Sequence, residues 1–249
     1  MVNSLLNAIK TYIKTYIDHL KDTSNVSDAR LRAKETAMKQ LSLYNLNPNL
    51  ITAYVNDMRK ALEKSDKCFI EIKFRTLRKF IAGWGPIYFI TEVPMAWDLI
   101  LDVPYIPGST IKGIIRDYFM ELTGDSKLTS CVFGDNNGVG KVIFFDSYPT
   151  NGGKILTYDI INPHYKGVNN EYDVMPVPIK FLAINEGVEF TTFLAFDKKE
   201  LEECGRNAFT SLLQSIIFST RMGWGRRTSR GYGDLEVISK RVELKCPSS

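Results

Sequence analysis

The spacing of the hydrophobic residues changes from a helical to an extended period at Cys68. Over residues 5–20, apolar side chains recur every three or four positions, which is typical of one face of an amphipathic helix. Weaker spacing predicts a second helix over 28–43, and Asn47-Pro48 marks the start of a third as N-cap and first-turn proline. Residues 1–66 are therefore predicted to form a helical appendage. It either packs on the main domain or docks another protein, and the sequence favours neither alternative.

Alternation of apolar and charged residues then predicts a strand from Cys68 to Thr76. Val142–Asp146 is apolar on both faces, which indicates a central strand. Further strands are predicted at 188–196 and, as the closing strand, through Leu235, Val237, Val242 and Leu244. Helices are predicted at 109–122, with Ser109 as N-cap, and at 201–217.

The order of these elements is strand, helix, strand, strand, helix, strand. It predicts the α+β class and a ferredoxin-like (RRM-like) βαββαβ core, the arrangement that RNA-recognition domains use. We expect this domain to occupy residues 67–249. Residues 147–187 are rich in Pro, Gly and Asn with little periodicity, so they are predicted to form a long insertion.

Composition limits the classes of function. The net charge of +4 over 249 residues is mild, so any binding of nucleic acid must come from a local cluster. The four cysteines are far apart and contain no C-x-x-C pair, which argues against a zinc site and a disulfide framework and predicts reduced thiols. Lys10 and Lys14 interrupt the apolar N-terminus, so neither a signal peptide nor a membrane span is predicted, and the location is expected to be cytoplasmic.

The segment 221–233 combines four glycines and four arginines with Trp224 and Tyr232, and contains no carboxylate. Glycine permits close backbone approach, guanidinium groups match phosphate, and aromatic faces can stack on bases. A nucleotide-binding P-loop is a poorer interpretation because the Gly-Lys-Ser/Thr ending is missing. The alternative is a glycine-rich turn with solvated arginines. The candidate phosphate ligands are Arg221, Arg226, Arg227 and Arg230.

A second candidate phosphate site lies at the start of the 109–122 helix. Lys112 is in the first turn, where the helix dipole disfavours a cation, and Arg116 follows one turn later. Free backbone N–H groups at Gly108 and Ser109 beside a lysine would suit a phosphate, although a solvated lysine is the alternative.

Several motifs together resemble the RAMP superfamily of CRISPR-associated RNA-binding proteins. The superfamily hallmark is a glycine-rich loop before the last strand, here Gly223–Gly233. The more specific resemblance is to the sixth Cmr subunit of the type III-B interference complex. It is carried by Tyr105–Gly113, Val132–Asp135, Lys141–Asp146, Asn162–Tyr165 and Val177–Leu182.

This resemblance implies a non-catalytic subunit that holds the guide RNA near its 3′ end. The implied partners are the other RAMP subunits and the small helical subunit of the Cmr complex, with target RNA bound indirectly and no membrane. His164 and Tyr165, in the subunit-specific stretch, join the candidate RNA-binding residues. No metal ion or other cofactor is expected.

Two observations bear on catalysis. The sister subunit that slices target RNA is thought to use an Asp after its first strand, whereas Arg75–Gly85 contains no carboxylate, so slicing is not expected. The main alternative is a guide-processing endoribonuclease that uses His164 in metal-independent acid–base chemistry. The only other histidine, His19, belongs to the helical appendage. A third class, a scaffold without RNA contact, would leave the arginine-rich loop unexplained.

Overall fold

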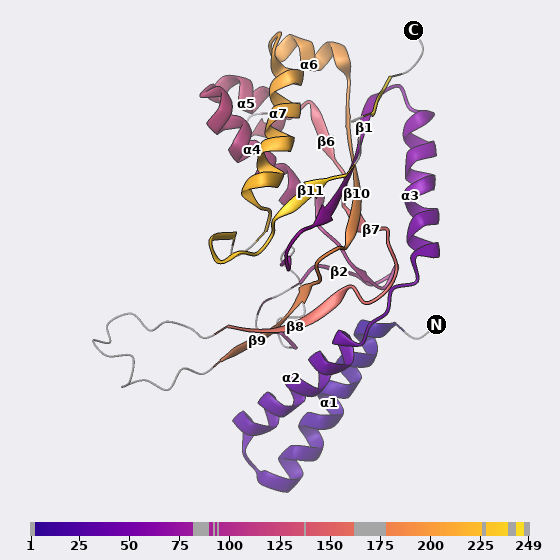
Figure 1. Ribbon diagram of the computed structural model, residues 1–249, viewed down its shortest axis with the longest axis vertical. Coiled ribbons are helices and arrows are strands. Elements are labelled where there is room, and N and C mark those ends of the chain that lie inside the picture. Colours follow the sequence, from indigo (N-terminus) through magenta and orange to yellow (C-terminus); the bar gives the residue numbers. More distant parts are fainter. Residues whose placement is uncertain are drawn as a thin grey trace, which may run out of the picture.

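An antiparallel sheet with helices on both faces lies at the centre of the computed structural model (Figure 1). The structure describes residues 3–81, 90–91, 93, 95–136, 138–161, 178–225, 228–238 and 243–246. The main strand order is β11-β1-β10-β6, while β12 pairs with β1 and β7 with β10. The bounds are β1 Cys68–Thr76, β6 Val142–Phe144, β7 Tyr148–Pro149, β10 Glu189–Phe196, β11 Leu235–Val237 and β12 Glu243–Lys245.

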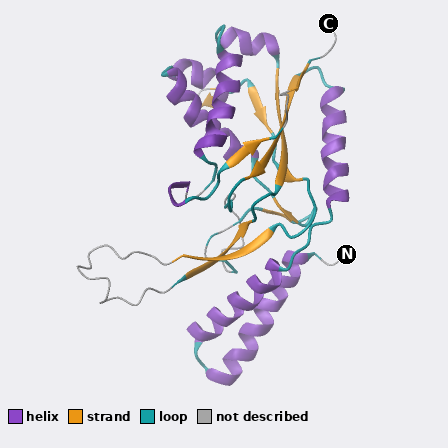
Figure 2. Ribbon diagram, viewed as in Figure 1, coloured by secondary structure: helices purple, strands orange, loops and turns teal. Residues whose placement is uncertain are grey.

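Helices and short hairpins complete the α+β fold (Figure 2). The helices are α1 Ser4–Thr23, α2 Val26–Ser42, α3 Pro48–Glu63, α4 Gly108–Thr123, α5 Ser126–Phe133, α6 Lys198–Cys204, α7 Ala208–Met222 and the 3₁₀ turn η2 Thr228–Arg230. Among the described residues, three antiparallel pairs lie outside the main sheet: β2 Trp97–Asp98 with β3 Val103–Pro104, β4 Gly134–Asp135 with β5 Gly138–Val139, and β8 Leu156–Ile161 with β9 Ile179–Ile184. None of the described helices is long and apolar enough to cross a membrane.

The alternation of β1 determines which helices cover each face of the sheet. Its Phe74 points to the layer of α4 and α7, because its ring lies 5.0 Å from that of Trp224, which follows α7. Its Glu71 points to the opposite face, where Arg59 of α3 binds it. Figure 1 shows α3 on one side of the sheet and α4 and α7 on the other.

The three helices predicted within residues 1–66 are confirmed. Asn3, Asn25 and Asn47 accept hydrogen bonds as N-caps of α1, α2 and α3. In Figure 1, α1 and α2 form a hairpin beside β8 and β9, and Glu35 of α2 pairs with Lys180 of β9. The separation of 1–66 as a domain stays a prediction.

The structure corrects several predicted elements. Val142–Asp146 does not form a central strand: β6 pairs only with β10 among the described strands, and Ile143 is 45% exposed. The 147–187 insertion has little periodicity in its sequence, yet its described part contains the β8–β9 hairpin. The single helix predicted at 201–217 is two, since the chain turns at Gly205, whose φ of 158° favours glycine.

The prediction of reduced cysteines is also wrong. The structure contains the disulfides Cys68–Cys246 and Cys131–Cys204, with Cα atoms 4.1 and 5.7 Å apart. Pairing of β12 with β1 brings Cys68 and Cys246 together, although they are 178 positions apart in the sequence. Local spacing could not reveal this proximity, since the fold creates it.

Candidate nucleic-acid interface

The topology brings the two predicted phosphate sites to the same end of the α4–α7 layer. β1 and β6 are each antiparallel to β10, so they are parallel to one another, and α4 connects them. Likewise α7 connects β10 to β11, which are parallel to one another and antiparallel to β1 and β6. Because the two helices connect strands of opposite direction, α4 and α7 run in opposite directions across the sheet. The rings of Tyr118 in α4 and Phe218 in α7 meet at 5.5 Å. The start of α4 therefore lies at the same end as the segment that follows α7.

Four predicted cations lie on the elements that meet at this end of the layer. Arg221 ends α7 and Arg230 ends η2, and both are exposed. Lys112 and Arg116 of α4 are half-buried. Within the described residues, none of the four forms an ion pair. We call Lys112, Arg116, Arg221 and Arg230 the cationic end.

The glycines after α7 let the loop pack against the chain that leaves β1. Gly233 donates its N–H to the Lys79 carbonyl at 3.0 Å, and Trp224 donates to the Gly233 carbonyl at 2.8 Å. A Cβ on Gly233 would lie 2.0 Å from the Trp224 oxygen, and one on Gly225 would lie 2.4 Å from the Ile81 oxygen. Both glycines also have positive φ. These two glycines are therefore required by packing within the chain, independently of any ligand.

Trp224 is not available for stacking on a base, which corrects the sequence prediction. Its side chain is 0% exposed and packs against Phe74 in the core. Its indole Nε1–H donates to the Ser219 hydroxyl at 3.0 Å, so its polar atom is satisfied inside the protein. The sequence shows that an aromatic residue is present but does not show that it points inward.

Tyr232 joins the loop to the β8–β9 hairpin. Its hydroxyl donates to Asp159 of β8 at 2.7 Å, and Lys79 binds the same carboxylate oxygen at 3.0 Å. Burial raises the pKa of Asp159, but the hydrogen bonds from Tyr232 and Lys79 outweigh burial and hold that pKa below its usual value. The triad of Lys79, Asp159 and Tyr232 thus holds three separate segments around the loop.

A carboxylate already occupies the start of α4, so the predicted phosphate site on its backbone N–H groups is corrected. The helix begins at Gly108, and Pro107 is its N-cap, so Ser109 is not the cap. Gly108 donates its N–H to Asp146 Oδ1 at 2.7 Å, and a Cβ on Gly108 would lie 2.3 Å from the Phe144 oxygen. Asp146 thus takes the place in which a phosphate was expected. Lys112 and Arg116 remain available as side-chain contacts.

Some candidate residues cannot be placed. Arg226, Arg227, His164 and Tyr165 lie outside the described residues. Within the described part of the chain, no three His, Cys, Asp or Glu side chains gather as a metal site would require.

The opposite face of the sheet is covered, a feature that the sequence did not reveal. RNA-recognition domains stack bases on aromatic residues of an open sheet face. Here Phe69 of β1 and Phe193 of β10 are each 2% exposed. The Arg59 guanidinium carbon lies 6.0 Å from the Phe193 ring centre, and the Lys245 nitrogen lies 5.9 Å from that of Phe69. This face is therefore closed to RNA in the structure.

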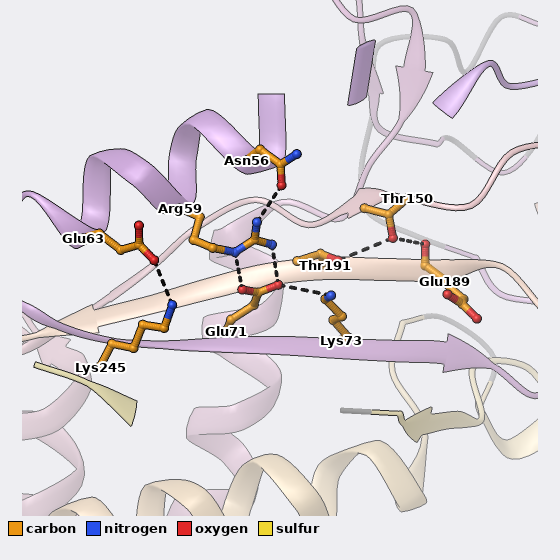
Figure 3. Close-up of polar contacts among 9 residues, drawn as sticks. All are labelled: Asn56, Arg59, Glu63, Glu71, Lys73, Thr150, Glu189, Thr191 and Lys245. Atoms are coloured by element: carbon orange, nitrogen blue, oxygen red, sulfur yellow. Dashed lines mark hydrogen bonds and ion pairs between the residues drawn. The ribbon is translucent and has the colours of Figure 1, made fainter. Parts of the chain in front are cut away.

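Ion pairs hold α3 over that face (Figure 3). Arg59 donates to both carboxylate oxygens of Glu71, at 2.6 and 2.7 Å, and Lys245 pairs with Glu63 at 2.8 Å. Burial raises the pKa of Glu71, but the hydrogen bonds and charge of Arg59 outweigh burial and lower that pKa overall. We call this contact the α3–sheet interface.

Comparison with known proteins agrees with the motif resemblance. A curated relative from Saccharolobus solfataricus, the CRISPR system CMR subunit Cmr6, is 29% identical over 90% of this chain and 79% of its own length. Cmr6 of Pyrococcus furiosus is 27% identical over 66% of each chain. A chain in the cryo-EM structure of the type III-B Cmr-beta bound to cognate target RNA matches with a TM-score of 0.74 and 25% identity, over 89% of this chain and 76% of that chain.

The resemblance to the sixth Cmr subunit is thus confirmed, since both curated relatives carry that name. The model of the RAMP superfamily matches residues 86–236, which is more than half of the sequence. This chain belongs to the RAMP superfamily.

Proposed function

We propose that this chain is a non-catalytic, RNA-binding subunit of a type III-B Cmr effector complex. It holds the guide RNA toward its 3′ end, and its protein partners are neighbouring RAMP subunits and the small helical subunit. The similarity to Cmr6 chains supports membership of the complex. The observation that carries RNA binding is the cationic end, whose four cations form no ion pair among the described residues.

The chemistry of the cationic end suits a phosphodiester backbone. Like charges repel one another unless an anion lies between them, so an unpaired group of this kind favours a polyanion. Trp224 is buried and Tyr232 is bound to Asp159, so the contacts expected here are with phosphates rather than bases. Arg226 and Arg227 extend the same loop in sequence and are proposed as further phosphate ligands.

The proposal includes a ferredoxin-like core. The strand order β11-β1-β10-β6, with α4 and α7 on one face, supports a βαββαβ unit whose strands run fourth, first, third, second. Unlike an RNA-recognition domain, this unit would bind RNA at the end of its helical layer, because α3 covers the open sheet face.

Binding by the purified chain to single-stranded guide RNA at several salt concentrations tests the proposal. Each lost phosphate contact flattens the log–log salt dependence by roughly 0.7. Replacing Arg221 and Arg230 by Ala should therefore flatten the slope by about 1.4. A triple Ala variant at Arg226, Arg227 and Arg230 should flatten it further. An unchanged slope in folded variants would contradict RNA binding at this loop.

The absence of catalysis has a separate test. The purified protein should leave guide precursor and complementary target RNA intact, with or without divalent metal ions. Cleavage that disappears in His164→Ala would contradict the proposal and support the endoribonuclease alternative, since imidazole can transfer protons near neutral pH.

A further inference from the structure

The two disulfides differ in how easily a reagent can reach them. In the Cys68–Cys246 bond, Cys246 is exposed at the end of β12, whereas Cys68 is only 4% exposed at the start of β1. Both cysteines of the Cys131–Cys204 bond are half-buried. Thiol–disulfide exchange begins when a thiolate reaches one of the two sulfur atoms, so access determines where it starts. Cys246 is the most exposed of the four cysteines and is therefore the favoured point of attack.

A pocket of about 330 Å³ lies where the end of α3 meets β1 and β12, and Cys246 lines it. Lys67, Lys245 and Glu63 line the same pocket. Lys245 binds Glu63 at 2.8 Å (Figure 3), whereas Lys67 forms no ion pair among the described residues. A cation beside a disulfide favours the approach of a negatively charged thiolate. We call this the Cys246 pocket.

The β12 strand has few contacts apart from the disulfide. It consists of Glu243–Lys245, and among the described strands it pairs only with β1, opposite Phe69–Glu71. Lys245 adds an ion pair with Glu63 and lies 5.9 Å from the centre of the Phe69 ring. Both partners of the ion pair are 42% exposed, and such surface pairs contribute little stability. A short edge strand held this weakly frays when its covalent link is removed.

The other disulfide joins elements that are already packed. Cys131 belongs to α5 and Cys204 ends α6. These helices bury Phe133 and Leu201 in the hydrophobic core, and those contacts do not depend on the disulfide. Reduction of Cys131–Cys204 should therefore leave both helices in place. This bond is the internal reference for the one at the Cys246 pocket.

We propose that the Cys246 pocket is a site of thiol–disulfide exchange, that its substrate is a dithiol, and that exchange there releases β12 from β1. One thiolate of the dithiol attacks Sγ of Cys246, the protein disulfide breaks, and Cys68 leaves as a thiolate that takes up a proton. The second thiolate of the dithiol attacks the mixed disulfide and displaces Cys246, which is protonated in turn. The dithiol is oxidised to its own disulfide, and two electrons pass to the protein.

Release of β12 changes two parts of the molecule. The edge of β1 at Phe69–Glu71 loses its neighbour, which leaves backbone groups unpaired there. The α3–sheet interface loses the contact of Lys245 with Glu63. Arg59 still binds Glu71, so α3 stays on the sheet. The place of β12 in the sheet thus depends on the redox state of a single bond.

Alkylation mapping of the purified, oxidised chain tests the site of attack. The protein is treated with dithiothreitol for increasing times and quenched with iodoacetamide, and peptide mass spectrometry quantifies each cysteine. Cys68 and Cys246 should become alkylated roughly tenfold faster than Cys131 and Cys204. Equal rates for the two pairs, or faster reaction of the Cys131–Cys204 pair, would overturn the proposal.

A lysine substitution tests the pocket itself. Lys67→Glu places a carboxylate where the thiolate approaches, so reduction of Cys68–Cys246 should slow by roughly threefold or more. Lys154→Glu is the matched control, since Lys154 is exposed and does not line the pocket, and it should leave the rate unchanged. Equal rates in the two variants would show that the thiolate does not pass the Cys246 pocket and would contradict the proposal.

Amide hydrogen exchange tests the release of β12. After reduction, exchange in Glu243–Lys245 should accelerate by roughly tenfold or more, while exchange in α5 and α6 changes little. Cys246→Ser should show the same fast exchange without reductant, and Cys204→Ser should not. Thermal melting checks that both variants are folded, and reduced wild type provides the decisive measurement if Cys246→Ser does not fold. Unchanged exchange of β12 in reduced wild type would show that the disulfide does not hold the strand, and the proposal would fail.

Discussion

The cationic end and the α3–sheet interface use charge in opposite ways. At the α3–sheet interface, Arg59 faces Glu71 and Lys245 faces Glu63, so each of these cations has a carboxylate within the chain. At the cationic end, Arg221 and Arg230 have no such partner among the described residues. Paired, half-buried charges hold one element against another, whereas unpaired cations at a surface can bind an anionic ligand. The two regions should therefore respond differently to substitution.

The largest effect on stability is expected for Glu71→Ala. This change leaves the half-buried Arg59 without its bidentate carboxylate, so the free energy of unfolding should fall by about 2–3 kcal/mol. Denaturant unfolding measures this change. Glu186→Ala, at an exposed site, is the control and should change the free energy of unfolding by less than about 0.5 kcal/mol. RNA affinity of the folded variant should stay the same. A loss of RNA affinity without a loss of stability would remove the distinction between the two regions.

Lys112→Glu should have the opposite profile. Losing about 1.4 kcal/mol of attraction lowers affinity roughly tenfold. A carboxylate that faces RNA phosphates repels them as well, so it should reduce RNA affinity by well over that factor. Melting temperature should not fall, because the helix dipole favours an acidic residue in the first turn. Lys127→Glu is the matched control, since Lys127 is an exposed lysine in the first turn of α5. Normal RNA affinity in Lys112→Glu would show that Lys112 is a solvated lysine that does not contact RNA.

Asp159→Asn tests the ion pair with Lys79, which adjoins the arginine-rich loop. The amide keeps part of the hydrogen bonding to Tyr232 but loses the charge that Lys79 pairs with, so stability should fall by about 1 kcal/mol. Hydrogen exchange of the Gly231 and Gly233 N–H groups should accelerate, because the loop is less firmly held. Unchanged exchange would show that the backbone contacts of the glycines suffice.

The smallest effect is expected in the pH dependence of stability. The folded-state pKa values of Glu71 and Asp159 are both lowered, so their contribution is present above the ordinary carboxyl pKa and is lost as pH falls through the lowered values. Stability should thus decline as the pH falls below the ordinary carboxyl pKa, at about pH 4 and lower, and the stability of Glu71→Gln should decline less steeply. Parallel pH curves for wild type and variant would contradict the assignment of this charge to the folded-state pair.

Sequence periodicity sufficed where neighbouring residues determine the structure. The cap Asn47 and the alternation of β1 could be predicted because each depends on residues a few positions away. The errors concern long-range partners. Asp146 reaches the start of α4 from 38 positions away, and Trp224 turns inward onto Phe74 of another element. Composition alone shows neither the partner nor the direction of a side chain.

The two disulfides give the covalent chain an unusual shape. Cys68–Cys246 closes most of the molecule into a ring, and Cys131–Cys204 nests a smaller ring inside it. Only the residues before Cys68 and after Cys246 lie outside. A force applied between the two ends of the oxidised chain can therefore peel away the N-terminal helices but cannot extend the sheet or the arginine-rich loop. The Cys68–Cys246 disulfide would carry such a force, so the residues between these two cysteines, including the cationic end, would not be stretched.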